Sequence, residues 1–174
     1  CCALMKKKFI IGTFNGLFFW FLLIGIINFW PLVKMEFNYR FSPKPVTDIS
    51  ALPEINIPDP YFSIVIPKIK AEAKIIANID AGKPAEYQPA LMKGVAHAKG
   101  TVFPGMKGTI FLFAHSTNGP WNVSRYNAIF YLLDKLVATD QIVIFYNSKI
   151  YIYRVSEVKI VSSKETGFFS QKEE

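Results

Sequence analysis

The sequence predicts an all-β domain, a barrel or a sandwich, preceded by a transmembrane helix. Segment 9–33 contains no charged residue, prolines recur in 34–60, and from Tyr61 onward short apolar runs alternate with Gly- and Pro-containing turns. The chain of 174 residues is therefore divided into a cytoplasmic N-terminus (1–8), a membrane span, a linker and one folded domain (61–174).

The charge-free segment 9–33 is long enough, as a helix, to cross a hydrocarbon core about 30 Å thick. Lys6, Lys7 and Lys8 precede it, and such charges favour the cytoplasmic side. We expect a single-pass signal anchor in the cell membrane, with the folded domain extracytoplasmic. A cleaved signal peptide is the alternative, but its apolar region is usually shorter and ends in small residues. Met5, just before the lysines, is typical of a natural start.

The linker 34–60 is expected to be a semi-extended spacer. Prolines interrupt both helices and central strands, because they lack a backbone N–H donor. The prolines of this segment are Pro43, Pro45, Pro53, Pro58 and Pro60.

Short apolar and β-branched runs in the folded domain predict its strands. Thr109–Ala114 is the run expected to be strongly buried, and a hairpin is expected around Asn147, Ser148 and Lys149. The predicted strands are Phe62–Ile66, Ala73–Ile79, Gly94–Ala98, Thr109–Ala114, Gln141–Tyr146, Ile150–Val155 and Val158–Val161.

One segment has helical rather than strand-like periodicity. Within Tyr126–Leu136, apolar residues recur at intervals of three and four, which predicts a helix with one buried side. The segment Asn122-Val123-Ser124, just before it, supplies a candidate N-cap.

His115 is the candidate catalytic residue. It follows the apolar run 109–114 and precedes the polar loop 116–120, so we expect it at the rim of the domain. An imidazole there can change its protonation near neutral pH and reach a ligand. By position alone, His115 fits better a histidine that only closes a strand through hydrogen bonds, and the neighbouring motifs change that balance.

Several segments together, in their order and spacing, resemble the sortase family over residues 61 to about 161. They read F-S-I-V-I-P-K-I at 62–69, Y-Q-P-A-L at 87–91, G-V-A-H-A-K-G-T-V-F-P-G-M-K-G-T-I-F-L-F-A-H-S at 94–116, and R-Y-N at 125–127. The residue before the histidine is usually Gly in that family and is Ala114 here. The resemblance implies a sortase-like closed β-barrel with one or two short helices.

The resemblance also implies a bacterial cell-surface transpeptidase with the thiol chemistry of a cysteine protease. A cysteine thiolate would attack a sorting signal near the C-terminus of a secreted protein, and an amine on a wall precursor or pilin would resolve the thioester. His115 matches the histidine that partners the cysteine. His97 matches an upstream histidine with a packing role. Arg125 does not take the oxyanion role, because that arginine follows the cysteine in sortases.

The chain departs from the family pattern at its cysteines. The only two are Cys1 and Cys2, and the chain reaches Glu174 without the T-L-x-T-C run or the later arginine of sortases. We therefore expect the barrel to be incomplete at its C-terminus, and the chain as given to be inactive and poorly stable alone.

Composition argues against several other classes of function. The two cysteines and the two histidines lack metal-site spacing, and we expect neither a metal nor a cofactor. The formal net charge is +7, but the basic residues are scattered apart from the lysine cluster at 6–8, so we expect no nucleic-acid partner. The alternative to an enzyme is a non-catalytic, membrane-tethered β-domain that binds a wall component or a protein partner.

Overall fold

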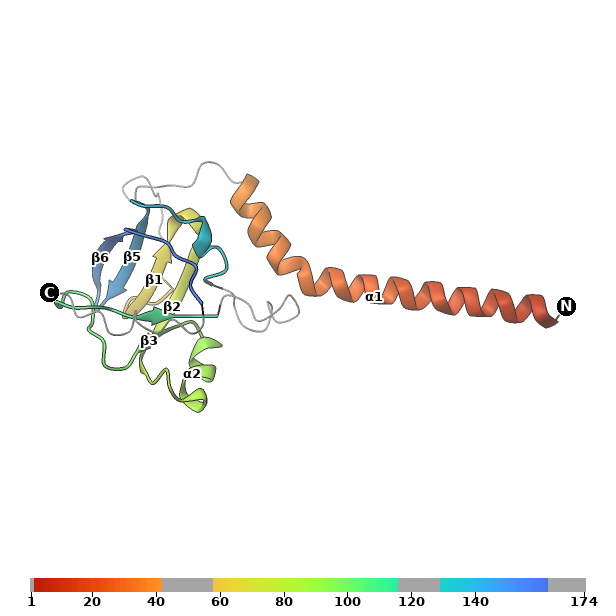
Figure 1. Ribbon diagram of the computed structural model, residues 1–174, viewed down its shortest axis with the longest axis horizontal. Coiled ribbons are helices and arrows are strands. Elements are labelled where there is room, and N and C mark those ends of the chain that lie inside the picture. The colour runs from red at the N-terminus through yellow and green to blue at the C-terminus, as the bar shows by residue number, and fades with distance from the viewer. Residues whose placement is uncertain (1, 42–57, 116–128, 163–174) are drawn as a thin grey trace.

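The computed structural model describes residues 2–41, 58–115 and 129–162. In this part of the chain, the long helix α1 leads to a folded unit built around one sheet (Figure 1). Its elements are α1 (Cys2–Phe41), β1 (Phe62–Ile66), η2 (Pro67–Ile69), β2 (Ala71–Ile79), α2 (Pro84–Leu91), β3 (Val95–Ala98), β4 (Leu112–Phe113), η4 (Leu133–Lys135), β5 (Gln141–Tyr146) and β6 (Lys149–Arg154).

The six strands form one mixed sheet in the order β4-β3-β2-β1-β5-β6. Only β2 and β3 run parallel, and the other neighbours are antiparallel. The expected closed barrel is not observed, which corrects the predicted fold. Closure requires the two outer strands to be joined, directly or through further strands. Within the described residues, β4 and β6 are the edges and no strand connects them.

The sequence located most strands closely. β1 and β5 have the predicted bounds. β2 and β3 differ by two residues and one residue at their starts, and β6 is shifted by one residue at both ends. The β5–β6 hairpin turns at Asn147 and Ser148, whose φ angles of 48° and 61° match the positive values of a two-residue primed turn.

One strand prediction was correct only in part, and another was wrong. The run Thr109–Ala114 is a strand only at Leu112–Phe113, and it is half-buried rather than strongly buried. The preceding residues belong to a loop stabilised by its own hydrogen bonds, such as Val102 N–H to Thr109 O. Val158–Val161 forms no strand, and its Ile160 side chain is 93% exposed.

The predicted helix Tyr126–Leu136 begins in residues 126–128, which lie outside the described residues. From Ile129 onward the chain forms turns and the short 3-10 helix η4. The expected buried side is nevertheless present, because Ile129, Leu132 and Leu136 are buried in the main core. Apolar spacing at three and four residues fits a 3-10 turn as well as an α-helix.

The helix α2 was not among the predicted elements. It starts at Pro84, where a proline needs no hydrogen-bond donor, and it also contains Pro89, which hid its helical pattern. Ala90 and Leu91 of α2 pack with Ala96 of β3 in a small separate cluster. The main core lies on the opposite face of the sheet and includes Phe62, Ile64, Ile66, Ile75, Val95 and Ile144.

The helix α1 is longer than the charge-free segment. Its candidate membrane span is Thr13–Trp30, with a mean hydropathy of 1.6 and none of the window buried. The helix continues to Phe41, so the first part of the predicted linker is helical, while 42–57 lies outside the described residues. α1 bends in its second half (Figure 1). Pro31, which lacks a backbone N–H, belongs to that half of the helix.

Candidate active site

His115 lies two residues beyond the end of β4, an edge strand of the sheet. It is half-buried, and its Nε2 atom is covered by the protein. β4 is held to β3 in antiparallel register, with Ala96 opposite Phe113 and His97 opposite Leu112. His115 therefore follows a strand that pairs with β3 through these two residue pairs.

The loop 99–111, between β3 and β4, is closed on itself by backbone hydrogen bonds. Ala98 N–H donates to Phe111 O at 2.9 Å, and Val102 N–H donates to Thr109 O at 3.2 Å. Gly105 and Gly108 have φ angles of +89° and +124°, in a region that side chains with a Cβ rarely adopt. Gly105 and Gly108, which belong to the sortase-like segment 94–116, thus allow the backbone conformation of this loop.

His97, on β3, is fully buried at 0% exposure and hydrogen-bonded at both ring nitrogens. Its Nδ1 accepts the backbone N–H of Asn78 at 3.3 Å, so Nε2 carries the proton. Nε2 lies 3.1 Å from Val102 O and 3.0 Å from Thr101 Oγ1. Thr101 Oγ1 also donates to Ala98 O. His97 therefore fastens the start of the 99–111 loop, in keeping with the packing role predicted for it.

Phe103 fixes the same loop through aromatic stacking. Its ring lies between those of His97 and Tyr146, with centroids 4.6 Å and 5.3 Å away and interplanar angles of 27° and 17°. Phe62 completes the cluster, 5.1 Å from the Tyr146 ring. Rings at these separations attract one another beyond their burial of area. Strands β1, β3 and β5 thus all hold the loop that precedes β4.

A buried ion pair lies near the end of β1. Lys68 Nζ is 2.7 Å from Asp140 Oδ2, and the two side chains are 13% and 4% exposed. The same carboxylate accepts the backbone N–H of Val137 at 2.6 Å. Sequence reasoning missed this pair, because nothing in the local pattern connects residues 72 positions apart.

Asp59 organises the start of β1. Hydrogen bonds from Lys74 Nζ and from the backbone N–H of Tyr61 hold the pKa of Asp59 below its usual range. The Asp59 backbone carbonyl also accepts the hydroxyl of Ser63 at 2.6 Å. This acid therefore joins the beginning of β1 to β2.

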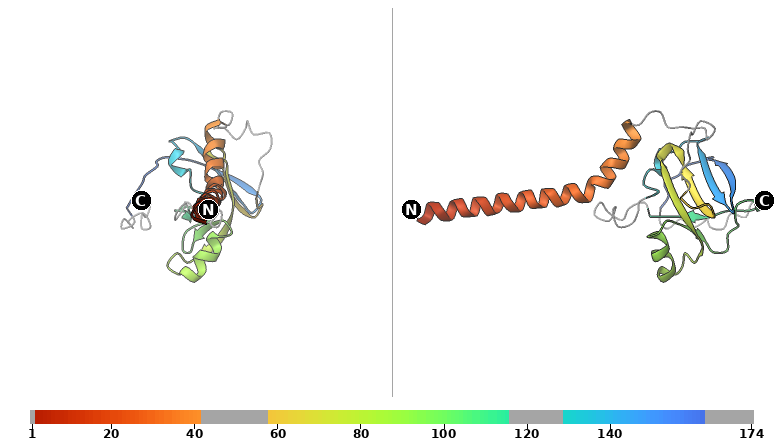
Figure 2. Two further views of the ribbon diagram at one scale, coloured as in Figure 1. Left: turned by 90° about the vertical axis from the view of Figure 1, so that its right-hand side faces the viewer. Right: turned by 180° about the vertical axis from the view of Figure 1, so that it is seen from behind.

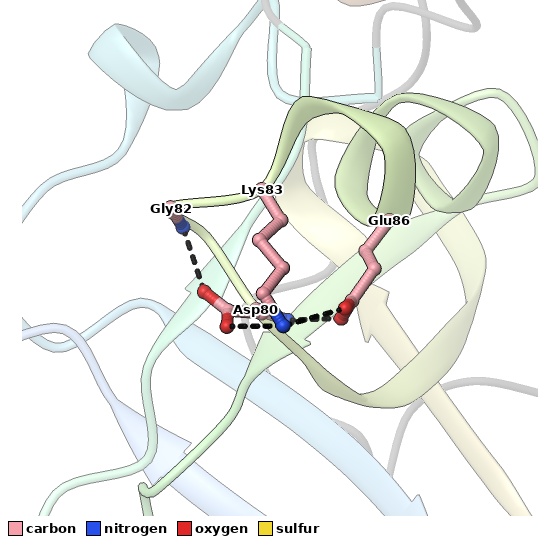
Figure 3. A network of polar contacts seen from close by, with 4 residues as sticks. All are labelled: Asp80, Gly82, Lys83 and Glu86. Atoms are coloured by element: carbon pink, nitrogen blue, oxygen red, sulfur yellow. Dashed lines mark hydrogen bonds and ion pairs between the residues drawn. The ribbon is translucent and has the colours of Figure 1, made fainter.

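A more exposed polar network precedes α2 (Figure 3). Lys83 Nζ lies 3.5 Å from Asp80 Oδ2 and 3.2 Å from Glu86 Oε1. The Gly82 N–H donates to Asp80 Oδ1 at 3.0 Å and lowers the pKa of Asp80. These contacts shape the turn between β2 and α2. Within the described residues, no group of three His, Cys, Asp or Glu side chains is placed to hold a metal ion.

A cavity of about 520 Å³ opens on the face of the sheet that carries the main core. Its lining is mainly apolar and does not include His115; the lining residues are Ile64, Ile66, Met106, Gly108, Thr109, Ile110, Phe111, Leu112, Phe130, Leu133, Ile142, Ile144 and Tyr153. Burial raises the pKa of Tyr153 at its margin. The cavity is thus a gap in the apolar core, with β1, β5 and the 99–111 loop around it.

The cysteines lie far from this site along the chain. Cys2 is the first residue of α1, a helix of 40 residues and thus about 60 Å long, and that end points away from the sheet (Figures 1 and 2). Cys1 and Arg125 lie outside the described residues. Of the candidate residues, the structure places His97 and His115 on neighbouring segments and brings no described cysteine near them.

The chain matches one family model, that of the Sortase domain, over residues 64–174. No curated protein sequence matches it. Its fold is similar to three solved sortases. They are a sortase D5 transpeptidase of Clostridium perfringens (25% identity, TM-score 0.49, covering 76% of this chain and 74% of that one), sortase C-1 of Actinomyces oris (22%, 0.49, 68% and 72%) and a lid mutant of sortase A from Corynebacterium diphtheriae (22%, 0.47, 67% and 56%). The chain thus spans little more than half of the Corynebacterium protein.

Proposed function

The chain belongs to the sortase family, and on this premise we propose that it forms the His115-bearing part of a membrane-anchored cysteine transpeptidase. In the proposed reaction, a cysteine thiolate attacks the scissile carbonyl of a C-terminal sorting signal on a secreted protein. A thioester forms and the amine leaving group departs. An amine on a wall precursor or a pilin then attacks the thioester, which releases the thiolate.

His115 is proposed as the acid and base of both steps. Its imidazolium gives a proton to the leaving nitrogen, and the neutral ring then accepts a proton from the incoming amine. The observation that carries this role is its place just after β4, at an edge of the sheet and within the matched domain. His97 does not suit the role, because it is fully buried and both ring nitrogens already have partners.

The thiol and the oxyanion-stabilising arginine are proposed to come from polypeptide outside residues 1–174. Cys1 precedes the long α1 helix and Cys2 is its first residue, so neither suits attack on a substrate bound at His115. Among the described strands β4 lies at an edge of the sheet, and an edge strand offers backbone donors and acceptors to a further strand. A strand paired there would run past His115. On this proposal, residues 1–174 alone form no thioester.

The membrane anchor is the second part of the proposal. We place the candidate span Thr13–Trp30 across the cell membrane, with Lys6, Lys7 and Lys8 in the cytoplasm and the sheet outside. Membrane-impermeant maleimide should then fail to label Cys1 and Cys2 in intact cells and label them after lysis. In a Cys1→Ser/Cys2→Ser background, Tyr61→Cys, at a site 72% exposed, should be labelled in intact cells. The reverse pattern would overturn this topology.

The catalytic proposal is tested on the gene and then on its product. The reading frame after the Glu174 codon should continue through a T-L-x-T-C run and an arginine-bearing strand. The longer protein should cleave fluorogenic sorting-signal peptides and yield hydroxamate with hydroxylamine. His115→Ala should lower that rate by about 10²–10⁴-fold. The exposed Lys99, just after β3, serves as a control, since Lys99→Ala should keep the rate.

Two results would contradict the enzyme proposal. A true stop codon after Glu174 would favour the non-catalytic, membrane-tethered β-domain. A longer protein in which His115→Ala stays folded, by near-UV circular dichroism, and turns over at the original rate would remove the acid–base role from His115.

A further inference from the structure

The last part of α1, residues 31–41, has a half-buried side and, opposite it, an exposed apolar side. One side is half-buried, and Tyr39 on it packs against the main core of the folded domain. The half-buried residues are Leu32, Met35, Glu36 and Tyr39. This side therefore has a protein partner already, which leaves the other side to be explained.

The opposite side carries an exposed row of large apolar residues, here termed the aromatic stripe. It consists of Trp30, Val33, Phe37 and Phe41, which are 60%, 54%, 56% and 69% exposed. Spacings of three and four residues place them on one side of the helix. The Phe37 and Phe41 rings lie 4.5 Å apart, so the stripe is a continuous surface rather than scattered side chains.

The stripe is continuous with the candidate membrane span. Trp30 is both the last residue of that span and the first of the stripe. Figures 1 and 2 show that the orange end of α1 bends away from the axis of the red part. A helix that leaves a bilayer and then bends lies closer to the membrane plane than the span itself. An apolar phase is thus adjacent to the stripe.

A groove runs along the flank of the same helical segment. It has a volume of about 530 Å³ and is lined by Phe29, Leu32, Val33, Glu36, Phe37, Arg40, Phe41 and, from the folded domain, Tyr131. Arg40 Nε is 2.8 Å from Glu36 Oε1 at its margin. Aromatic rings with a nearby guanidinium suit the boundary between acyl chains and phosphate headgroups.

We propose that the aromatic stripe rests in the outer headgroup region of the bilayer that α1 crosses. The segment 31–41 then lies on the membrane surface with its other side against the folded domain. The domain is held close to the lipid rather than on a free tether. This inference takes from the proposed function only the assignment of α1 as a membrane span, and it does not depend on the chemistry of His115.

The test uses the full chain in liposomes with Cys1→Ser and Cys2→Ser and a single labelled cysteine. Phe37→Cys reports on the stripe, and Asn38→Cys is the matched control, one residue along and off the stripe. Phe21→Cys reports on the middle of the span. Each carries a bimane label, which is quenched either by doxyl groups on lipid acyl chains or by aqueous iodide.

The label at 37 should be quenched by doxyl lipid several-fold more than the label at 38, with the opposite order for iodide. The label at 21 should be quenched by lipid alone. Equal quenching at 37 and 38, with 21 still quenched by lipid, would overturn the surface-lying stripe and leave the span in place. No lipid quenching at 21 would overturn both. Self-quenching at 37 that rises with protein concentration, without lipid quenching, would show a second copy on the stripe and would likewise overturn the inference.

Discussion

The buried pair Lys68–Asp140 gives the sharpest stability prediction. At 2.7 Å, two unit charges attract by about 6 kcal/mol if the effective dielectric constant is near 20. Taking both charges out of water costs several kcal/mol each, so the intact pair contributes little net stability. Removing one partner is different, because the other charge then stays buried without compensation.

We therefore expect Lys68→Met and Asp140→Asn each to lower the free energy of unfolding by about 3–5 kcal/mol. The double variant should lose no more than either single variant, because neither charge is then left alone. The amide oxygen that Asp140→Asn introduces can still accept the Val137 N–H that Asp140 now binds, so the loss reports mainly on the charge. The measurement is the urea midpoint of the full chain in detergent, which should fall by on the order of 2 M in the single variants.

The exposed pair of Lys83 and Glu86 provides the matched control. These side chains are 60% and 44% exposed, and water and salt screen such pairs. Lys83→Met should leave the urea midpoint unchanged. If Lys68→Met also left it unchanged, or if the losses of the two single variants simply added in the double variant, the pair would not be the uncompensated buried charge described above.

Three further predictions concern the sheet and the loop before β4. Gly94→Ala should lower the free energy of unfolding by about 1–3 kcal/mol, because the added Cβ would overlap the backbone carbonyl of Lys74. An unchanged urea midpoint would place that carbonyl elsewhere. His97→Ala should lower the free energy of unfolding by about 3–5 kcal/mol, because it removes buried packing and leaves buried polar groups unpaired. It should also weaken the near-UV circular dichroism of the Phe103 stack. The lowered pKa of Asp59 means that its ionised carboxylate stabilises the folded state. This stabilisation is present above the usual carboxyl pKa, near 3.8, and is lost as the pH falls through the lower pKa that Asp59 has in the folded protein. Asp59→Asn should flatten that acid limb of a pH–stability profile, and an identical limb would refute the assignment.

The strands were predictable because they carry local signals. β1 and β5 are rich in apolar and β-branched residues and are followed by turn residues, and both have the predicted bounds. Thr109–Ala114 has an equally apolar run but is mostly a loop, since β4 is an edge strand and pairs only briefly with β3. Composition indicates a strand but cannot show how much of it finds a partner, because pairing depends on residues distant in sequence.

The candidate site was only partly predictable for the same reason. The position of His115 at the end of a strand followed from the sequence, whereas its catalytic role stays a prediction. The partners of His97 did not follow, because Asn78 and Val102 reach its ring only after β2 and the 99–111 loop are in place. The exposed side of α1 at Phe37 also escaped prediction, since the prolines after it suggested a spacer rather than a helix that continues to Phe41.

The segment from β3 to His115 is held together by contacts within it and with its neighbours. His97 and Phe103 fasten the beginning and middle of the 99–111 loop, and Thr101 Oγ1 accepts the N–H of Phe111 at 3.4 Å, just before β4. β4 contributes only two ladder pairs with β3, too few to fix its position firmly. The contacts of the 99–111 loop must therefore contribute much to fixing the position of β4 and of His115 after it. The two histidines of the sequence thus differ in their surroundings: His97 is fully buried and hydrogen-bonded to the 99–111 loop, whereas His115 is half-buried beyond the end of β4.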